Sequence, residues 1–180
     1  MSGLLLAATA ATTVALAWPV ERHLATYERL VPGQEIAEVF VERAGAGRYR
    51  VSLTRLPSGR MQVLELKGTQ WRLEVRTLQW TGRAAQLGLL PRQRIERIAA
   101  RDATAQPGPG QAFELSQPAG RDLWTQVRGS SRGFRLAEAS LLEGPWLALG
   151  DGHRYVLKVS RTPLALEARR RPGGNEPGAP

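Results

Sequence analysis

Few residues in this chain carry side chains that act as nucleophiles, general bases or metal ligands. The 180 residues include no cysteine and two histidines, His23 and His153. Disulfides, cysteine-ligated metal centres and a helix with two histidine ligands are therefore excluded. The best acid–base candidate is His153 with Asp151 and an undetermined serine or Asp122. Asp151 and the glycine after it form a typical turn, and His153 opens a segment in phase with Tyr155, so the pattern favours a structural role.

Other catalytic and cofactor-binding patterns are also missing. The stretch Pro107-Gly108-Pro109-Gly110 has neither the lysine nor the hydroxyl of a phosphate loop, and its prolines lack N–H donors. Ser130 and Ser131 lie in GSSRG, which does not fit a nucleophile elbow. The glutamates near the first expected strand are explained by a solvated strand face; they are Glu35, Glu38 and Glu42. We therefore expect no enzymatic activity, no cofactor and no metal.

Tryptophan is the residue type best suited to binding. Trp71 begins an expected strand and faces inward, which indicates core packing. Trp80, Trp124 and Trp146 fall at the ends of expected elements. There they either line a barrel mouth or groove for a partner or lipid, or seal the end of the core.

Arginine is the second candidate residue type. Arg76, together with Arg92, Arg94, Arg97 and Arg101, forms either an anion-attracting strip near a membrane or solvated strand faces. In a strand, Arg92 and Arg94 share one face, and Arg97 and Arg101 share the other. The predicted binding residues are Trp80, Trp124, Trp146, Arg76 and Arg94.

The chain is strongly basic, with a formal net charge of +9. Lys67 and Lys158 are its only lysines, so arginine supplies almost all of the positive charge. Such a surface attracts anionic lipids, acidic proteins and nucleic acid. A GC-rich genome is the favoured explanation of the arginine bias, and the arginines are scattered except for Arg169-Arg170-Arg171. This scatter argues against a dedicated nucleic-acid face.

Period-two alternation predicts antiparallel strands. A meander of four strands is expected at 35–43, 47–55, 60–67 and 70–80, with glycine turns between them. Short helical segments are expected at 82–89 and 121–128, a loop at 105–111, and last strands at 153–160 and 164–169, with a strand near 145–149 paired to them. Segment 92–102 is ambiguous; Ile95 and Ile98 suit a helix, but its neighbours favour a strand. The expected fold is mainly β, an antiparallel barrel or sandwich of seven to eight short strands with one or two short helices, preceded by an N-terminal apolar helix.

Residues 1–20 carry no charged side chain and form the apolar segment. They are either a single-pass transmembrane anchor or a signal peptide cleaved after Ala17; a buried soluble helix is a third alternative. We expect a juxtamembrane linker at 21–33, the β domain at 34–169 and a disordered tail at 170–180. Arg22 and Arg29 follow the apolar segment, which by the positive-inside rule places the domain in the cytoplasm.

The stretch from Trp71 to Asp102 resembles a known family. Trp71, Leu73, Arg76, Leu78, Trp80 and Gly82 fit a W-x-L-x-x-R-x-L-x-W-x-G block, and Leu87-Gly88-Leu89 fits the end of a small-residue helix. Residues 120–124 and 151–155 look like later G-x-D-L-W and D-G-x-x-Y segments. These motifs are similar to those of an uncharacterised family of bacterial inner-membrane-anchored proteins, common in pseudomonads.

Members of that family are often labelled multidrug or cation efflux pumps, although one span cannot enclose a transport path. The resemblance implies a domain facing the periplasm, with the cytoplasm and secretion after cleavage as alternatives. We predict a non-enzymatic, membrane-tethered β domain that acts as an accessory, scaffold or ligand- or lipid-binding module at the inner membrane. Its partner is then a polytopic membrane protein or anionic lipid. The alternatives are an accessory component of an efflux system and a cytoplasmic basic domain that binds nucleic acid.

Overall fold

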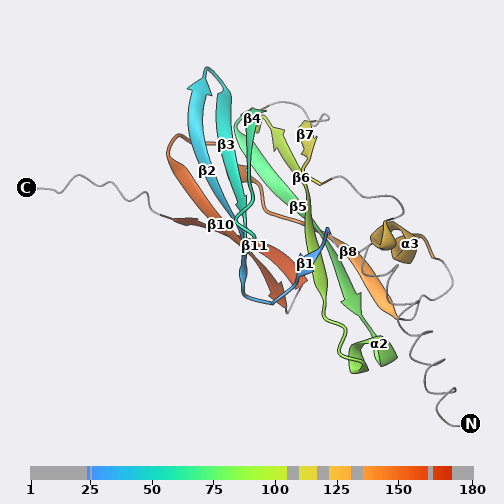
Figure 1. The fold of residues 1–180 in the computed structure, drawn as a ribbon. Helices are drawn as coiled ribbons and strands as arrows, with labels where there is room; N and C mark the ends of the chain where they lie inside the picture. The colour runs from blue at the N-terminus through green and yellow to red at the C-terminus, as the bar shows by residue number, and fades with distance from the viewer. Residues whose placement is uncertain are drawn as a thin grey trace, which may run out of the picture. The chain divides into compact units, whose positions relative to one another are not determined.

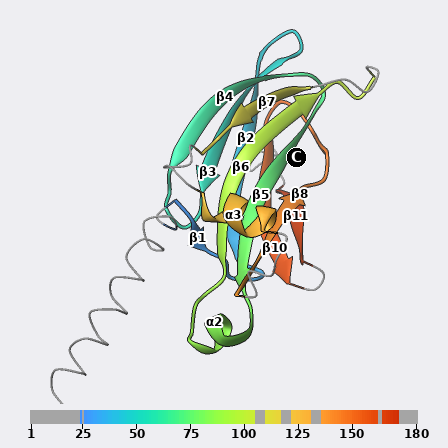
Figure 2. The ribbon, with the colours of Figure 1, turned by 90° about the vertical axis from the view of Figure 1, so that its right-hand side faces the viewer.

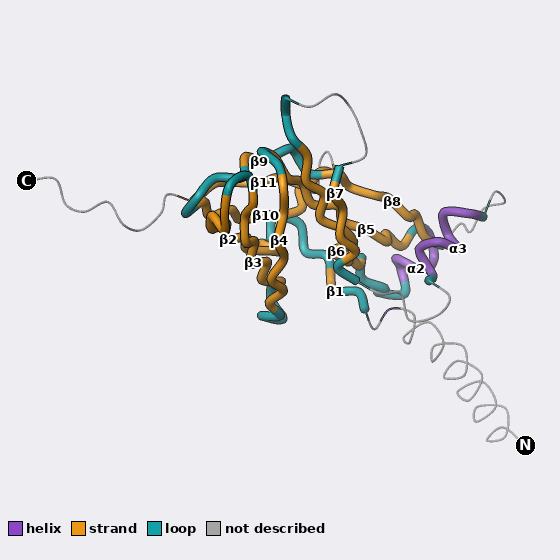
Figure 3. Tube along the Cα trace, turned by 90° about the horizontal axis from the view of Figure 1, so that it is seen from above, coloured by secondary structure: helices purple, strands orange, loops and turns teal. Residues whose placement is uncertain are grey.

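The computed structural model describes residues 24, 26–104, 110–116, 122–130, 136–161 and 164–171. Figure 1 labels most of the helices and strands in these ranges, and Figure 3, which also labels β9, shows that strands dominate them. The predicted N-terminal anchor, its cleavage point after Ala17 and the end of the predicted tail lie outside the described residues. Within them, no helix has the length and apolar character that a bilayer crossing requires.

The described residues form eleven strands and two short helices, where seven to eight strands were expected. In chain order the elements are β1 (Glu28–Arg29), β2 (Glu35–Gly45), β3 (Arg48–Arg55), β4 (Met61–Lys67), β5 (Gln70–Trp80), α2 (Gly82–Gln86), β6 (Arg92–Arg101), β7 (Gln111–Glu114), α3 (Leu123–Gly129), β8 (Ala137–Glu143), β9 (Leu147–Ala148), β10 (His153–Arg161) and β11 (Leu164–Arg171).

Two sheets contain these strands. One has the order β11-β10-β2-β3-β4, and the other follows the path β1-β6-β5-β8, with β7 paired to β6 and β9 paired to β5. The mainly β prediction is thus confirmed. The described strands do not close into a barrel, so that alternative of the prediction is wrong for this part of the chain.

The chain divides into two units. The smaller comprises residues up to Arg29 with Thr77–Arg94 and Ser116–Ser140. The larger comprises Leu30–Arg76, Ile95–Leu115 and the chain from Leu141 onward. Strands β5, β6 and β8 each continue from one unit into the other.

The expected meander forms over three strands rather than four. β2 pairs with β3, and β3 with β4, in antiparallel register. β5 then belongs to the other sheet. The chain changes sheets at Gly68, whose φ of 125° suits glycine and whose added Cβ would collide with the carbonyl of Arg101. The amide of Thr69 donates to that carbonyl at 2.9 Å, so the Gly68-Thr69 turn joins two sheets and is not a hairpin.

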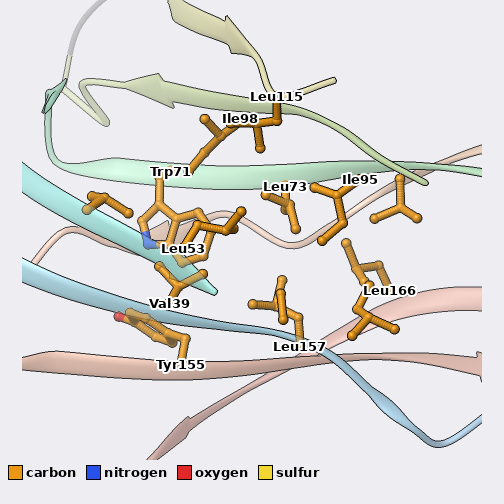
Figure 4. Close-up of a cluster of buried hydrophobic side chains, with 14 of the residues drawn as sticks. Val39, Leu53, Trp71, Leu73, Ile95, Ile98, Leu115, Tyr155, Leu157 and Leu166 are labelled. Carbon is orange, nitrogen blue, oxygen red and sulfur yellow. The ribbon is translucent and has the colours of Figure 1, made fainter. Parts of the chain in front are cut away.

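The hydrophobic core of the larger unit lies between residues from both sheets. Figure 4 shows Trp71, Leu73 and Ile95 on one side of this core and Tyr155 and Leu157 on the other. The alternation of β5 and β10 produces this arrangement, because every second side chain faces the same way. The predicted inward orientation of Trp71 is confirmed, since its side chain is fully buried.

Segment 92–102 is a strand, as the neighbouring pattern indicated. Ile95, Ile98 and Ala100 of β6 all belong to the core. The inward-facing alternation therefore changes phase between Ile95 and Ile98. This shift produces the spacing of three residues that resembles a helix in the sequence.

Several other expectations need correction. The predicted linker at 21–33 contains β1, which pairs with β6, and the buried side chains of Leu24, Tyr27 and Leu30. The strand near 145–149 is the short β9, and it pairs with β5 rather than with the last strands. β7 and β8 were not predicted, and β11 extends to Arg171, into the predicted tail. Helices α2 and α3 lie within or next to their predicted ranges.

Candidate functional site

Trp146 lies beside two arginines in the larger unit. The guanidinium carbon of Arg101 is 4.0 Å from the centroid of the indole ring, and that of Arg72 is 4.8 Å from it. Arg72 is placed here because Trp71 and Leu73 of β5 face the core, so the residue between them faces away. Arg101 ends β6, where its guanidinium donates twice to Oε1 of Gln70, at 3.1 and 3.0 Å.

The buried side chain of Glu74 forms hydrogen bonds with Arg72 and with a third arginine at this surface, Arg97. Oε2 of Glu74 accepts hydrogen bonds from Nε and Nη2 of Arg97 at 2.9 and 2.7 Å, and Oε1 accepts one from Arg72 at 3.2 Å. Arg72 also donates to Glu143 at 2.7 Å. The hydrogen bonds to Glu74 raise the pKa of the Arg97 guanidinium, against a smaller opposing effect of burial.

We name Arg72, Arg97, Arg101 and Trp146 the arginine face. Two carboxylates, Glu74 and Glu143, form ion pairs with Arg72 and Arg97, and Glu114 adds to the electrostatic attraction at Arg97. Arg101 instead donates to the neutral amide of Gln70. A guanidinium that lies over an indole ring and remains exposed can donate hydrogen bonds to a phosphate or carboxylate group.

Arg76, a predicted binding residue of the larger unit, has a carboxylate partner. Its Nη2 lies 3.0 Å from Oε1 of Glu96, whose side chain is almost completely buried. A buried carboxylate needs such a partner, because an isolated charge in the core is strongly unfavourable. The contact assigns Arg76 a structural role.

Arg94, predicted as a surface residue, is buried in the smaller unit. Its side chain is 1% exposed, and its Nη2 lies 3.1 Å from Oδ2 of Asp122, which is 6% exposed. The guanidinium also donates to the hydroxyl of Thr26 at 3.0 Å and lies 4.4 Å from the ring centroid of Tyr27. The Tyr27 hydroxyl donates to Asp122 at 2.9 Å.

These four residues form what we name the Arg94 clamp: Thr26, Tyr27, Arg94 and Asp122. It connects the segment before β1 to β6 and to the residue that precedes α3. The prediction of an exposed arginine strip is therefore wrong for Arg94. Alternation in β6 gave no indication of this, because the partner Asp122 is distant in the sequence.

His153 and Asp151, the weak acid–base candidate, form hydrogen bonds within the fold. Nδ1 of His153 lies 3.0 Å from the hydroxyl of Tyr155, and that hydroxyl donates to the carbonyl of Ala148 at 2.8 Å. Oδ1 of Asp151 accepts the backbone N–H of Arg43 at 2.7 Å, so the turn between β9 and β10 is bonded to the end of β2. The Gly150-Asp151-Gly152 turn joins strands of different sheets and is not the hairpin that its glycines suggest. In the part of the chain that the structure describes, no group of three acidic or histidine side chains is arranged to hold a metal ion.

Tyr155 is expected to ionise at higher pH than an ordinary tyrosine. Burial raises the pKa of its phenol above the usual 10.0, and the nearby charge of Arg170 opposes this in part. A folded-state pKa above the unfolded value means that this contribution to stability is complete below pH 10.0 and is lost as pH rises through the folded pKa.

Alkaline titration of phenolate absorbance measures this effect. The Tyr155 phenol should titrate above the usual 10.0. The substitution Tyr155→Phe should remove a component from the late part of the titration. A late part of unchanged size in Tyr155→Phe would contradict the raised pKa of Tyr155.

The other two predicted tryptophans lie in the smaller unit. Trp124 of α3 is 7% exposed and donates from Nε1 to the carbonyl of Ser140 at 3.2 Å, so the core-sealing alternative holds for it. Trp80 ends β5, is half-buried and donates from Nε1 to the carbonyl of Leu90 at 2.9 Å.

Beside Trp80, the connection between β5 and β6 exposes a group of leucines. Leu87 is 83% exposed, and Leu89, Leu90 and Leu136 are also exposed. We name these four leucines and Trp80 the leucine tip; Figure 2 shows α2 in the connection that carries most of it. The run LGLLP in the sequence predicts a helix end and does not by itself indicate that its leucines are exposed.

Comparison with models of protein families, with curated protein sequences and with solved structures finds no match for this chain. The family resemblance in the sequence therefore stays a prediction. Two surfaces are candidates for a function in binding, the arginine face of the larger unit and the leucine tip of the smaller one.

Proposed function

We propose that this chain is a non-enzymatic binding module, tethered to a membrane by its N-terminal apolar segment, that binds anionic groups through the arginine face. The two sheets, with one core between them in the larger unit, suit an antiparallel sandwich that presents this face. The observation that carries the proposal is the pair of guanidinium groups over Trp146, at 4.0 and 4.8 Å.

Three features support binding over catalysis. The buried carboxylates Glu74 and Glu96 each neutralise arginines, so their role is explained by structure. His153 and Asp151 are likewise engaged in structural hydrogen bonds. The net charge of +9 adds a long-range attraction for anions.

The chemistry of the arginine face fits a phosphate or carboxylate group. A guanidinium donates to such oxygens through charge-assisted hydrogen bonds, and an indole ring beneath it fixes its orientation. A phospholipid headgroup, an acidic segment of a partner protein and a nucleic-acid backbone all carry this chemistry. The first two sources fit the proposed place at the inner membrane.

A pair of matched charge variants tests the arginine face. The ligand is a short inorganic polyphosphate, added to the full chain in neutral detergent. Arg101→Gln should weaken binding about tenfold, the effect of losing one charge-assisted hydrogen bond. The control is Arg154→Gln, which removes the same charge from an exposed arginine that lies 5.3 Å from the ring of Phe40.

Equal weakening by Arg101→Gln and Arg154→Gln would show diffuse attraction to the net charge and contradict a specific face. Replacing the polyphosphate by a short-chain phosphatidylglycerol, an acidic peptide and a single-stranded oligonucleotide separates the three sources. Tightest and steeply salt-dependent binding to the oligonucleotide would favour the nucleic-acid alternative. Co-purification with a polytopic membrane protein after mild extraction would favour the efflux-accessory alternative.

A further inference from the structure

The leucine tip combines exposed apolar side chains with a well-defined backbone. The amide of Leu89 donates to the carbonyl of Ala84 at 3.3 Å, and that of Gly88 donates to Ala85 at 3.0 Å. The indole of Trp80 holds the carbonyl of Leu90, at 2.9 Å. These hydrogen bonds order the backbone of the connection, and its leucine side chains are exposed.

Such exposure is unfavourable in water. An exposed leucine forgoes the transfer free energy that burial provides, and contiguous exposed apolar side chains mark interaction sites. Leu136 extends the patch from a second segment, since the amide of Thr81 donates to the Leu136 carbonyl at 2.9 Å. The tip is thus an apolar surface built from two parts of the chain.

Charge around the tip indicates what covers it. The part of the smaller unit from Thr77 to Arg94 contains no acidic residue, and its three arginines are Arg83, Arg92 and Arg94. Arg94 is buried in the clamp, whereas Arg92 is half-buried two residues before it on β6. Exposed leucines and a tryptophan on a segment whose charged residues are all basic are typical of surfaces that enter the interface of an anionic bilayer.

The Arg94 clamp limits how far this unit can lie from the tether. Tyr27 is fixed to Asp122 and Arg94 in the smaller unit, the unit that carries the tip. The predicted membrane segment ends at Val20. Seven residues reach at most about 25 Å, so a spanning segment keeps this unit within that distance of the bilayer.

We propose that the leucine tip inserts into the headgroup interface of an anionic phospholipid bilayer, with Trp80 at the boundary between apolar and polar layers. This inference rests on the proposed function, because it takes the N-terminal segment as the tether. It adds a second attachment point, formed by the fold itself. The smaller unit then contacts the bilayer with a fixed orientation.

Site-specific labelling of the full chain tests the insertion. The sequence contains no cysteine, so Leu87→Cys carries a single environment-sensitive fluorophore. The matched control is Met61→Cys on β4, which is 65% exposed but belongs to the larger unit. Both labelled chains are assembled into lipid nanodiscs that contain phosphatidylglycerol or phosphatidylcholine alone.

In phosphatidylglycerol discs, the label at position 87 should show a blue-shifted emission, lose quenching by a water-soluble quencher and gain quenching by brominated lipid. The label at 61 should show none of these changes. Arg92→Gln should reduce the shift at position 87, because it weakens attraction to the anionic lipid. The shift should also be smaller in discs of phosphatidylcholine alone.

Three other outcomes would each contradict insertion of the leucine tip. A water-exposed label at 87 in a chain held by the disc overturns insertion and leaves the tether and the arginine face standing. A label shielded from water but not quenched by brominated lipid shows that protein covers the tip, which also overturns insertion. A chain that does not enter the disc overturns the tether, and this inference with it.

Discussion

Replacing Arg94 with methionine is expected to lower the free energy of unfolding by about 3–5 kcal/mol. The substitution leaves the carboxylate of Asp122 buried, with its 3.1 Å cationic partner gone. It also removes the hydrogen bond to Thr26 and the cation that lies over Tyr27. Chemical denaturation, followed by circular dichroism, measures the change.

The matched control is Arg92→Met, two residues earlier on β6 and less buried. A partly exposed arginine of this kind should change the free energy of unfolding by about 0.5 kcal/mol or less. The double variant Arg94→Met with Asp122→Leu should recover most of the loss, because no buried charge is then unpaired. Equal effects of Arg94→Met and Arg92→Met would contradict the Arg94 clamp.

The strands of the larger unit could be predicted because alternation reports directly on burial. Tyr155, Leu157 and Val159 alternate with polar residues except at Val156, and the structure buries all three, with Val156 as well. The turn between β2 and β3 could also be predicted from the sequence, because position 47 is a glycine and its φ of 63° favours glycine. In such segments a local pattern and the core require the same arrangement.

Pairing between strands could not be predicted in the same way. Gly68 signals a turn, but whether the next strand rejoins the same sheet depends on the Arg101 carbonyl, more than thirty residues later. In β6, the change of phase between Ile95 and Ile98 obscured the period of two. Both cases depend on contacts far apart in the sequence, which local patterns do not contain.

Among the candidate binding residues, the sequence likewise predicted the position of some correctly and of others wrongly. Trp146 was expected at an element end, and the structure places it under Arg72 and Arg101. Arg94 was expected on the surface, yet Asp122 and Tyr27 enclose it. An arginine on an alternating strand looks identical in both situations, so only the fold distinguishes a binding arginine from a structural one.

Trp71→Ala is expected to lower the free energy of unfolding by about 3–5 kcal/mol, the range for removing a buried aromatic side chain. The ring is fully buried and meets Tyr155 edge-on, with 5.6 Å between ring centroids. Figure 4 shows it beside Leu53 in the core of the larger unit. Removing it leaves a cavity between the two sheets, measurable as a lower denaturation midpoint.

The substitution Trp71→Phe distinguishes the effect of the cavity on stability from the effect of losing the indole N–H. The indole N–H of Trp71 donates to no acceptor in the described part of the chain, so phenylalanine sacrifices no hydrogen bond there. Its effect should be about 1–2 kcal/mol, since only part of the ring volume is removed. If Trp71→Phe were as destabilising as Trp71→Ala, the indole N–H of Trp71 would have to form a hydrogen bond that contributes to stability.

The matched comparison is Trp146→Ala, because this tryptophan is half-buried and belongs to the arginine face. It should destabilise the fold far less than Trp71→Ala, and it should weaken polyphosphate binding by releasing Arg101 from its position. Trp71→Phe should leave that binding unchanged. A reversed result, with stability dependent on Trp146 and binding dependent on Trp71, would place the anion site in the core and contradict the arginine face.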